Sequence, residues 1–157
     1  MHKLLAVVFL FLVSRSSLGS VRDVLREEYK QIAMAASIDL ALDPALVFAV
    51  IANESAWQAR VQSYKGAIGL MQLMPETARN WGVHDPLNPK ENIYAGARYL
   101  KHLLSLFDKN MPLAIAAYHA GEARIVTSRK IPDIPETQMY VRAVLATYRK
   151  LKTGEFR

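Results

Sequence analysis

Glu54 is the residue whose position in this sequence most directly suggests acid–base chemistry. It follows eight consecutive apolar residues, 45–52, which predict a buried helix, and it falls at the carboxyl end of that helix. Burial and the negative end of a helix dipole both disfavour a carboxylate, so each raises the pKa of the side chain. A carboxylic acid that stays partly protonated near neutral pH can act as a general acid. The residues alone leave an alternative open, a helix-terminal glutamate turned toward solvent.

The loop that follows Glu54 contains small residues and no acid. Residues 66–75 read Gly-Ala-Ile-Gly-Leu-Met-Gln-Leu-Met-Pro. The two glycines permit unusual backbone conformations, so the loop can press against an extended ligand. Segment 64–74 has no Asp or Glu, so we expect no second carboxylate opposite Glu54. The next acids along the chain are predicted on surface or loop positions: Glu76, Asp85 and Glu91. A partner carboxylate folded in from one of these positions is the alternative.

The elements that position these residues are predicted to be helices. Apolar spacing, caps and prolines indicate an amphipathic helix over residues 21–40, a buried helix from Asp43-Pro44, a short helix over 75–79, a long helix over 93–107, a buried helix over 113–120 and a last amphipathic helix over 140–151. No convincing alternating strand appears. We therefore expect one compact, mainly α domain with two buried central helices and little or no sheet.

The first residues predict an export signal. An unbroken apolar run from Leu4 to Val13 follows a cationic start, and Ser17-Leu18-Gly19 fits a small-x-small cleavage site. Ten apolar residues rise only ~15 Å as a helix, about half the hydrocarbon core, so no permanent membrane anchor is expected. We expect residues 1–19 to be a cleaved signal peptide and residues 20–157 to form the folded domain in the periplasm. An N-terminal helix that belongs to the fold is the alternative.

Composition excludes several other classes of protein. The chain has no cysteine, so neither a disulfide framework nor a thiol for lipid attachment is available. Its net charge of +6 is spread along the chain, without a basic run or interleaved aromatics, and therefore indicates no nucleic-acid partner. His84 and His102 lack ligand spacing with any other His or acid, so neither a metal ion nor a cofactor is expected.

Four motifs in register extend the interpretation from Glu54 to nearly the whole mature chain. They are Glu54-Ser55 with Ser63 nine residues later, Gly66-Ala67-x-Gly69-Leu70-Met71-Gln72-x-Met74-Pro75, Ala117-Tyr118-x-Ala120-Gly121, and Tyr140-Val141. In type and order they resemble the soluble lytic transglycosylase domain, a family of lysozyme-like enzymes that cleave peptidoglycan. The resemblance implies a lysozyme-like fold, of the α+β superfamily but with little or no sheet, and a catalytic domain over residues 20–157.

Carried over position by position, the resemblance implies roles for individual residues. It makes Glu54 the catalytic acid and base, with Ser55 orienting its surroundings. It implies that the substrate-binding positions are Ser55, Ser63, Gln72, Met74, Tyr118, His119 and Tyr140. Ordinary packing remains an alternative for the two tyrosines. Core filling remains an alternative for Met74 and is preferred for Met71.

Two positions depart from the family pattern. His119 stands where the family usually has Asn, and Ala59 replaces the usual proline after the acid-containing motif. Protonation of His119 would place a charge beside the proposed cleft and lower activity on mild acidification. A neutral, packed imidazole with one hydrogen bond is the alternative. Ala59 lies in a connection, where the change matters less.

The expected function is cleavage of the β-1,4 bond between N-acetylmuramic acid and N-acetylglucosamine in peptidoglycan glycan strands. With one carboxylate, the C6 hydroxyl of the muramic residue replaces water, and the product carries a 1,6-anhydromuramic end. A lysozyme-type hydrolase and a catalytically silent, glycan-binding scaffold subunit remain as alternatives. Small family members with only a signal peptide resemble enzymes of secretion, conjugation or pilus systems, which implies local wall opening for such an apparatus.

Overall fold

The computed structural model describes residues 2–154, with side chains described for residues 21–154. These residues form seven α-helices: α1 (His2–Asp39), α2 (Pro44–Ser55), α3 (Pro75–Asn80), α4 (Pro89–Leu106), α5 (Met111–Ala120), α6 (Glu122–Ser128) and α7 (Pro135–Thr153). Within the same range, β-structure is limited to two isolated bridges, Gln62 with Ile68 and Ile68 with Leu73. The predicted mainly α domain with little or no sheet is confirmed.

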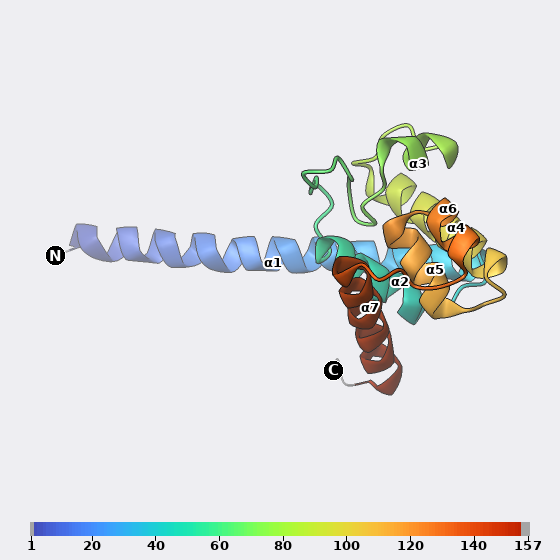
Figure 1. Cartoon of the computed structure of the whole chain (residues 1–157). Helices are drawn as coiled ribbons and strands as arrows, with labels where there is room; N and C mark the ends of the chain where they lie inside the picture. The colour runs from blue at the N-terminus through green and yellow to red at the C-terminus, as the bar shows by residue number, and fades with distance from the viewer. Residues whose placement is uncertain (1, 155–157) are drawn as a thin grey trace.

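The two central helices are α2 and α5, which lie between the other elements in Figure 1. α2 packs against α1 and α7, while α5 packs against α4, α6 and α7. Both are buried through apolar residues, Leu46, Val47 and Ala49 to Ile51 in α2 and Ala114 to Ala117 in α5. The alanines of α5 leave room for its neighbours, so the two helices form one continuous core with α4 and α7. The prediction of two buried central helices is confirmed.

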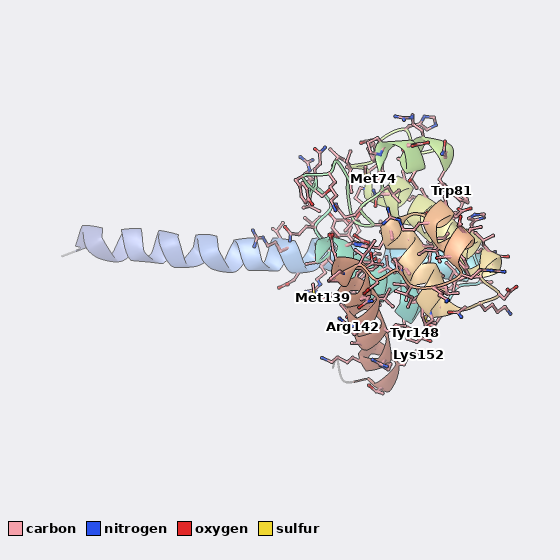
Figure 2. The ribbon with its side chains drawn as sticks, in the orientation of Figure 1. Met74, Trp81, Met139, Arg142, Tyr148 and Lys152 are labelled. Atoms are coloured by element: carbon pink, nitrogen blue, oxygen red, sulfur yellow. The ribbon has the colours of Figure 1, made fainter. Side chains whose placement is uncertain are left out.

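Asp43 starts α2 and also ties it to the far end of the chain. Its Oδ1 accepts a hydrogen bond from the Ala45 N–H at 3.0 Å, and Pro44 occupies the first helical position. The Asp43 Oδ2 accepts hydrogen bonds from the Tyr148 hydroxyl at 2.9 Å and from Lys152 Nζ at 3.1 Å. Tyr148 and Lys152 are labelled on α7 in Figure 2. The cap therefore fixes the start of α2 against the last helix.

Two elements differ from the sequence prediction. α1 begins at His2 instead of near residue 21, and its N-terminal part extends beyond the other helices in Figure 1. No proline interrupts this stretch, and the single Gly19 costs a helix only about 1 kcal/mol. α6 was not predicted, because it is short, follows Gly121 directly and buries only Ile125.

The predicted signal peptide, residues 1–19, lies outside the part of the chain whose side chains the structure describes. The cleavage prediction therefore stays a prediction. None of the helices formed by residues 21–154 has the length and apolar character that crossing a bilayer requires.

The irregular segment between α2 and α3 is held in place by Asn92 of α4. This side chain is 1% exposed, and its Nδ2 donates to the carbonyl oxygens of Ile68 and Pro86, both at 2.9 Å. Its Oδ1 accepts from the Met71 N–H at 2.8 Å. Gly69 has φ +83°, and a Cβ at this position would collide with the Asn92 amide. One buried amide and one glycine therefore set the path of the loop.

We expect Asn92→Ala to destabilise the protein strongly. The change leaves the Pro86 carbonyl and the Met71 N–H without partners and removes one of the two donors to the Ile68 carbonyl, and the expected loss in unfolding free energy is about 3 kcal/mol. Urea denaturation measures the loss. Asn80→Ala on the exposed side of α3 is the matched control, expected within about 0.5 kcal/mol of wild type. Equal stability of the two variants would contradict the role given to Asn92.

Candidate active site

A pocket of about 220 Å³ opens beside Glu54, where the carboxyl end of α2 meets the loop before α3, the end of α5 and the start of α7. Its lining residues are Glu54, Ser63, Tyr64, Lys65, Ala67, Gln72, Met74, Tyr118, His119 and Glu136. The fold thus brings together six residues that the sequence analysis singled out: Glu54, Ser63, Gln72, Met74, Tyr118 and His119.

Glu54 occupies the last turn of α2, because the helix ends one residue later. Ala56 and Trp57 have φ of 49° and 66°, so the chain turns away from the helix axis at this point. The Trp57 ring is 7% exposed and packs edge-on against Phe48, with ring centroids 5.4 Å apart. This buried tryptophan fixes the reversal and leaves Glu54 at the negative end of the helix.

The environment of Glu54 favours its protonated form. Burial raises the pKa of the carboxyl from its ordinary 4.5 to about 7, and a hydrogen bond from the Tyr140 hydroxyl opposes this rise. That hydroxyl donates to Glu54 Oε1 at 2.5 Å. Near neutral pH, a carboxyl in this state can donate a proton to a bound group and take one back.

Two tyrosines frame the acid from different helices. Tyr140 on α7 donates its hydroxyl to Glu54, and Tyr118 on α5 donates its hydroxyl to the Met71 carbonyl at 2.8 Å. Burial, reinforced by the charge of Glu54, raises the pKa of both phenols well above the ordinary value. Both therefore remain protonated donors. Tyr140 holds the acid, while Tyr118 fastens the loop to α5.

Gln72, Ser63 and Met74 lie on the loop wall of the pocket. Gln72 has φ +47°, and its Nε2 donates to the carbonyls of Val61 at 3.1 Å and Gly69 at 3.0 Å. The Ser63 Oγ accepts from the Ala67 N–H at 3.0 Å. Met74, labelled in Figure 2, precedes α3 and is 44% exposed. The two polar side chains brace the wall, and Met74 offers it an apolar surface.

Ser55 lies apart from the pocket. It is 6% exposed and donates its hydroxyl to the Ile51 carbonyl at 3.2 Å, within its own helix. Met71 is fully buried and packs in the core, as preferred from the sequence. Among residues 21–154, no three His, Asp or Glu side chains gather where they could hold a metal ion.

Sequence reasoning missed several residues of the site, above all Glu136. Its carboxylate is the second one in the pocket lining, and it lies 3.6 Å from Lys65 Nζ. This ion pair links the loop to the start of α7. Tyr64, 92% exposed beside Lys65, was also missed. The signal for Asn92 was present, since it is a polar residue on the apolar stripe of its helix.

The comparisons with known proteins agree with this geometry. The model of the Transglycosylase SLT domain matches residues 31–140, so the chain belongs to the SLT transglycosylase family. It is 45% identical over 101 residues to a transglycosylase of Enterobacteria phage PRD1, covering 64% of this chain and 38% of the phage protein. It is 38% identical over 98 residues to a membrane-bound lytic murein transglycosylase F of Pseudomonas fluorescens, covering 59% of this chain and 20% of that protein.

Solved structures show the same fold. The 70 kDa soluble lytic transglycosylase of Escherichia coli superposes with a TM-score of 0.69 at 30% identity, over 87% of this chain and 27% of that one. An inactive mutant of the lytic transglycosylase Slt from Pseudomonas aeruginosa gives 0.67 at 32% identity, over 80% and 24%. The lysozyme-like SLT fold inferred from the motifs is confirmed, and the chain spans well under half the length of each of these four proteins.

The raised pKa of Glu54 predicts a pH-dependent cost to stability. The folded-state pKa, about 7, exceeds the ordinary 4.5, so unfolding free energy falls as pH rises through this window. Glu54→Gln removes the ionisable group. We therefore expect the variant to be more stable than wild type by about 1–3 kcal/mol at pH 8 and nearly equal to it at pH 4.

Chemical denaturation at the two pH values measures this difference. Glu28→Gln, on an exposed part of α1, is the control and is expected to stay within about 0.5 kcal/mol of wild type. A Glu54→Gln variant that gains nothing between pH 4 and pH 8 would show that Glu54 ionises freely in the folded protein.

Proposed function

We propose that this chain is a peptidoglycan lytic transglycosylase that cleaves the β-1,4 bond between N-acetylmuramic acid and N-acetylglucosamine. The observation that carries the proposal is the state of Glu54, a partly buried carboxyl with a pKa of about 7 that lines a pocket. Membership of the SLT family and relatives named as lytic murein transglycosylases support it. The pocket walls, formed by residues of three of the four motifs, supply polar and apolar surface beside the acid for a glycan.

In the first step, Glu54 donates its proton to the glycosidic oxygen. The bond between that oxygen and C1 of the muramic residue breaks, and the N-acetylglucosamine leaves with a new hydroxyl. Positive charge develops at C1, where the 2-acetamido oxygen of the same sugar can meet it. Glu54 is left as a carboxylate, stabilised by the hydrogen bond from Tyr140.

In the second step, the Glu54 carboxylate takes the proton of the muramic C6 hydroxyl. The freed oxygen attacks C1 within the same sugar and closes a 1,6-anhydro ring, so no water is consumed. This attack is intramolecular, and a well-oriented internal nucleophile has a high effective molarity over solvent. The acid is thereby returned to its protonated state.

A lysozyme-type hydrolase is the second candidate, because Glu136 places another carboxylate in the pocket lining. In a two-carboxylate mechanism this group would act as the nucleophile or activate a water. Its 3.6 Å pairing with Lys65 favours the first candidate, because the carboxylate that would attack C1 or orient a water is already engaged by a cation. The two candidates differ in their product and in their need for Glu136.

Mass analysis of muropeptides released from purified sacculi tests the reaction. We expect 1,6-anhydromuramic ends, lighter by one water than hydrolysis products. Glu54→Gln should lose at least the ~10²-fold to 10⁴-fold that general acid–base catalysis supplies, because Glu54 acts in both steps. Glu136→Gln should still yield the anhydro product. Reducing-end muramic acid that disappears in Glu136→Gln would establish the hydrolase, and no lysis by folded wild-type protein would favour the scaffold subunit.

We further propose that residues 20–157 act in the periplasm, where peptidoglycan is accessible. The apolar run from Leu4 to Val13 and the small residues up to Gly19 support export and cleavage. By analogy with family members that serve such systems, we also propose a specialised role, the opening of local gaps in the wall for a secretion, conjugation or pilus apparatus.

N-terminal sequencing of the protein from a periplasmic fraction tests export. We expect the mature chain to begin at Ser20, because small residues follow the apolar run at the required distance only there. Leu10→Arg places a charge in the middle of the run and should retain the protein in the cytoplasm. An exported chain that keeps Met1 would contradict cleavage.

A further inference from the structure

His119 lies against the residue that holds the catalytic acid. Its imidazole stacks on the ring of Tyr140, with centroids 4.5 Å apart and planes inclined by 20°. The hydroxyl of the same tyrosine donates to Glu54 Oε1. Three side chains from three helices, α5, α7 and α2, thus form one continuous contact. His119 is also the position where the sequence departs from the Asn of the family pattern.

The contact restrains a side chain that must stay in place for Glu54 to work. Among residues 21–154, Tyr140 is the one hydrogen-bond partner of the Glu54 carboxyl. This bond engages Oε1 and so directs the carboxyl. A phenol ring can rotate about its side-chain torsions, and a planar neighbour on its face limits that rotation through favourable stacking. Loss of the neighbour would let the hydroxyl move away from Oε1.

We propose that His119 is a positioning residue, whose imidazole holds the Tyr140 ring so that the hydroxyl stays on Glu54 and orients its carboxyl toward the pocket. The proposal deepens the proposed function, because it rests on Glu54 being the general acid. His119 acts through Tyr140 and needs no contact with the glycan for this role.

Burial of His119 favours a neutral ring. The titratable groups that surround it are Glu54, Lys65, Glu136 and Tyr140, with Tyr118 beside it on α5. Burial lowers the pKa of His119, Glu136 opposes the shift, and Lys65 reinforces it. Because its pKa is lowered, the ring takes up a proton at a lower pH than a free imidazole does, which favours the packed imidazole of the sequence analysis over the acid-driven switch.

Two substitutions separate the plane of the ring from its bulk. His119→Phe keeps a flat ring on Tyr140, whereas His119→Leu keeps a similar volume without a plane. We expect the kcat of His119→Leu to fall about tenfold with little change in KM. We expect His119→Phe to retain most of the wild-type kcat. His119→Asn, the residue of the family pattern, is a second ring-free variant and should behave like His119→Leu.

A double-mutant cycle with Tyr140→Phe shows through which residue His119 acts. Without the hydroxyl there is nothing for His119 to position, so His119→Leu and His119→Phe should have equal kcat in the Tyr140→Phe background. If His119→Leu still costs about tenfold relative to His119→Phe in that background, His119 acts directly on the glycan and the proposal is overturned.

The pKa of Glu54, followed by carbon NMR of its carboxyl, provides a readout independent of lysis. Since the Tyr140 hydrogen bond lowers this pKa, we expect it to rise in Tyr140→Phe and in His119→Leu, but not in His119→Phe. An unchanged pKa in His119→Leu and in His119→Asn would refute positioning. If the variants show these shifts but wild-type protein lyses no sacculi, the proposed function alone is refuted.

Discussion

The central constraint in this structure is that one carboxyl, that of Glu54, is kept in an environment less polar than water. The apolar body of α2 brings it there, the small side chains of α5 let the neighbouring helices close around it, and α7 supplies the Tyr140 hydroxyl as its hydrogen-bond donor. No cation accompanies this carboxyl among the contacts that shift its pKa. Binding a proton then costs less free energy than burying a charge. The carboxyl is therefore held in the protonated state that a general acid needs.

The carboxyl groups at the two ends of α2 have different functions because their environments differ. Asp43 sits at the positive end of the helix. Although burial alone would raise its pKa, hydrogen bonds from Lys152, the Ala45 N–H and Tyr148 outweigh that effect and lower it. Asp43 therefore stays charged and stabilises the fold. Glu54, at the negative end, has a pKa of about 7 and is partly protonated near neutral pH. One helix carries a structural anion at its start and a proton donor at its end.

The sequence revealed those features that depend on neighbours along the chain. The apolar run before Glu54, the Asp43-Pro44 start and the Gly121 helix end each have a local physical cause, and the motifs placed most of the pocket lining. The features that escaped notice depend on contacts between distant segments. The pairing of Lys65 with Glu136 and the stacking of His119 on Tyr140 need the packing of the loop and α5 against α7, which no local pattern encodes.

Asn92 has a consequence beyond the shape of the loop. Its three hydrogen bonds join the pocket wall to the middle of the fold through a helix whose apolar face is buried in the core. Opening the wall would break these bonds and expose a buried amide, so we expect the wall to be rigid. Motion of the pocket wall is therefore expected to depend on the contacts between the wall and α4. Binding of a polymer to such a preorganised surface does not carry the entropic cost of ordering a mobile loop.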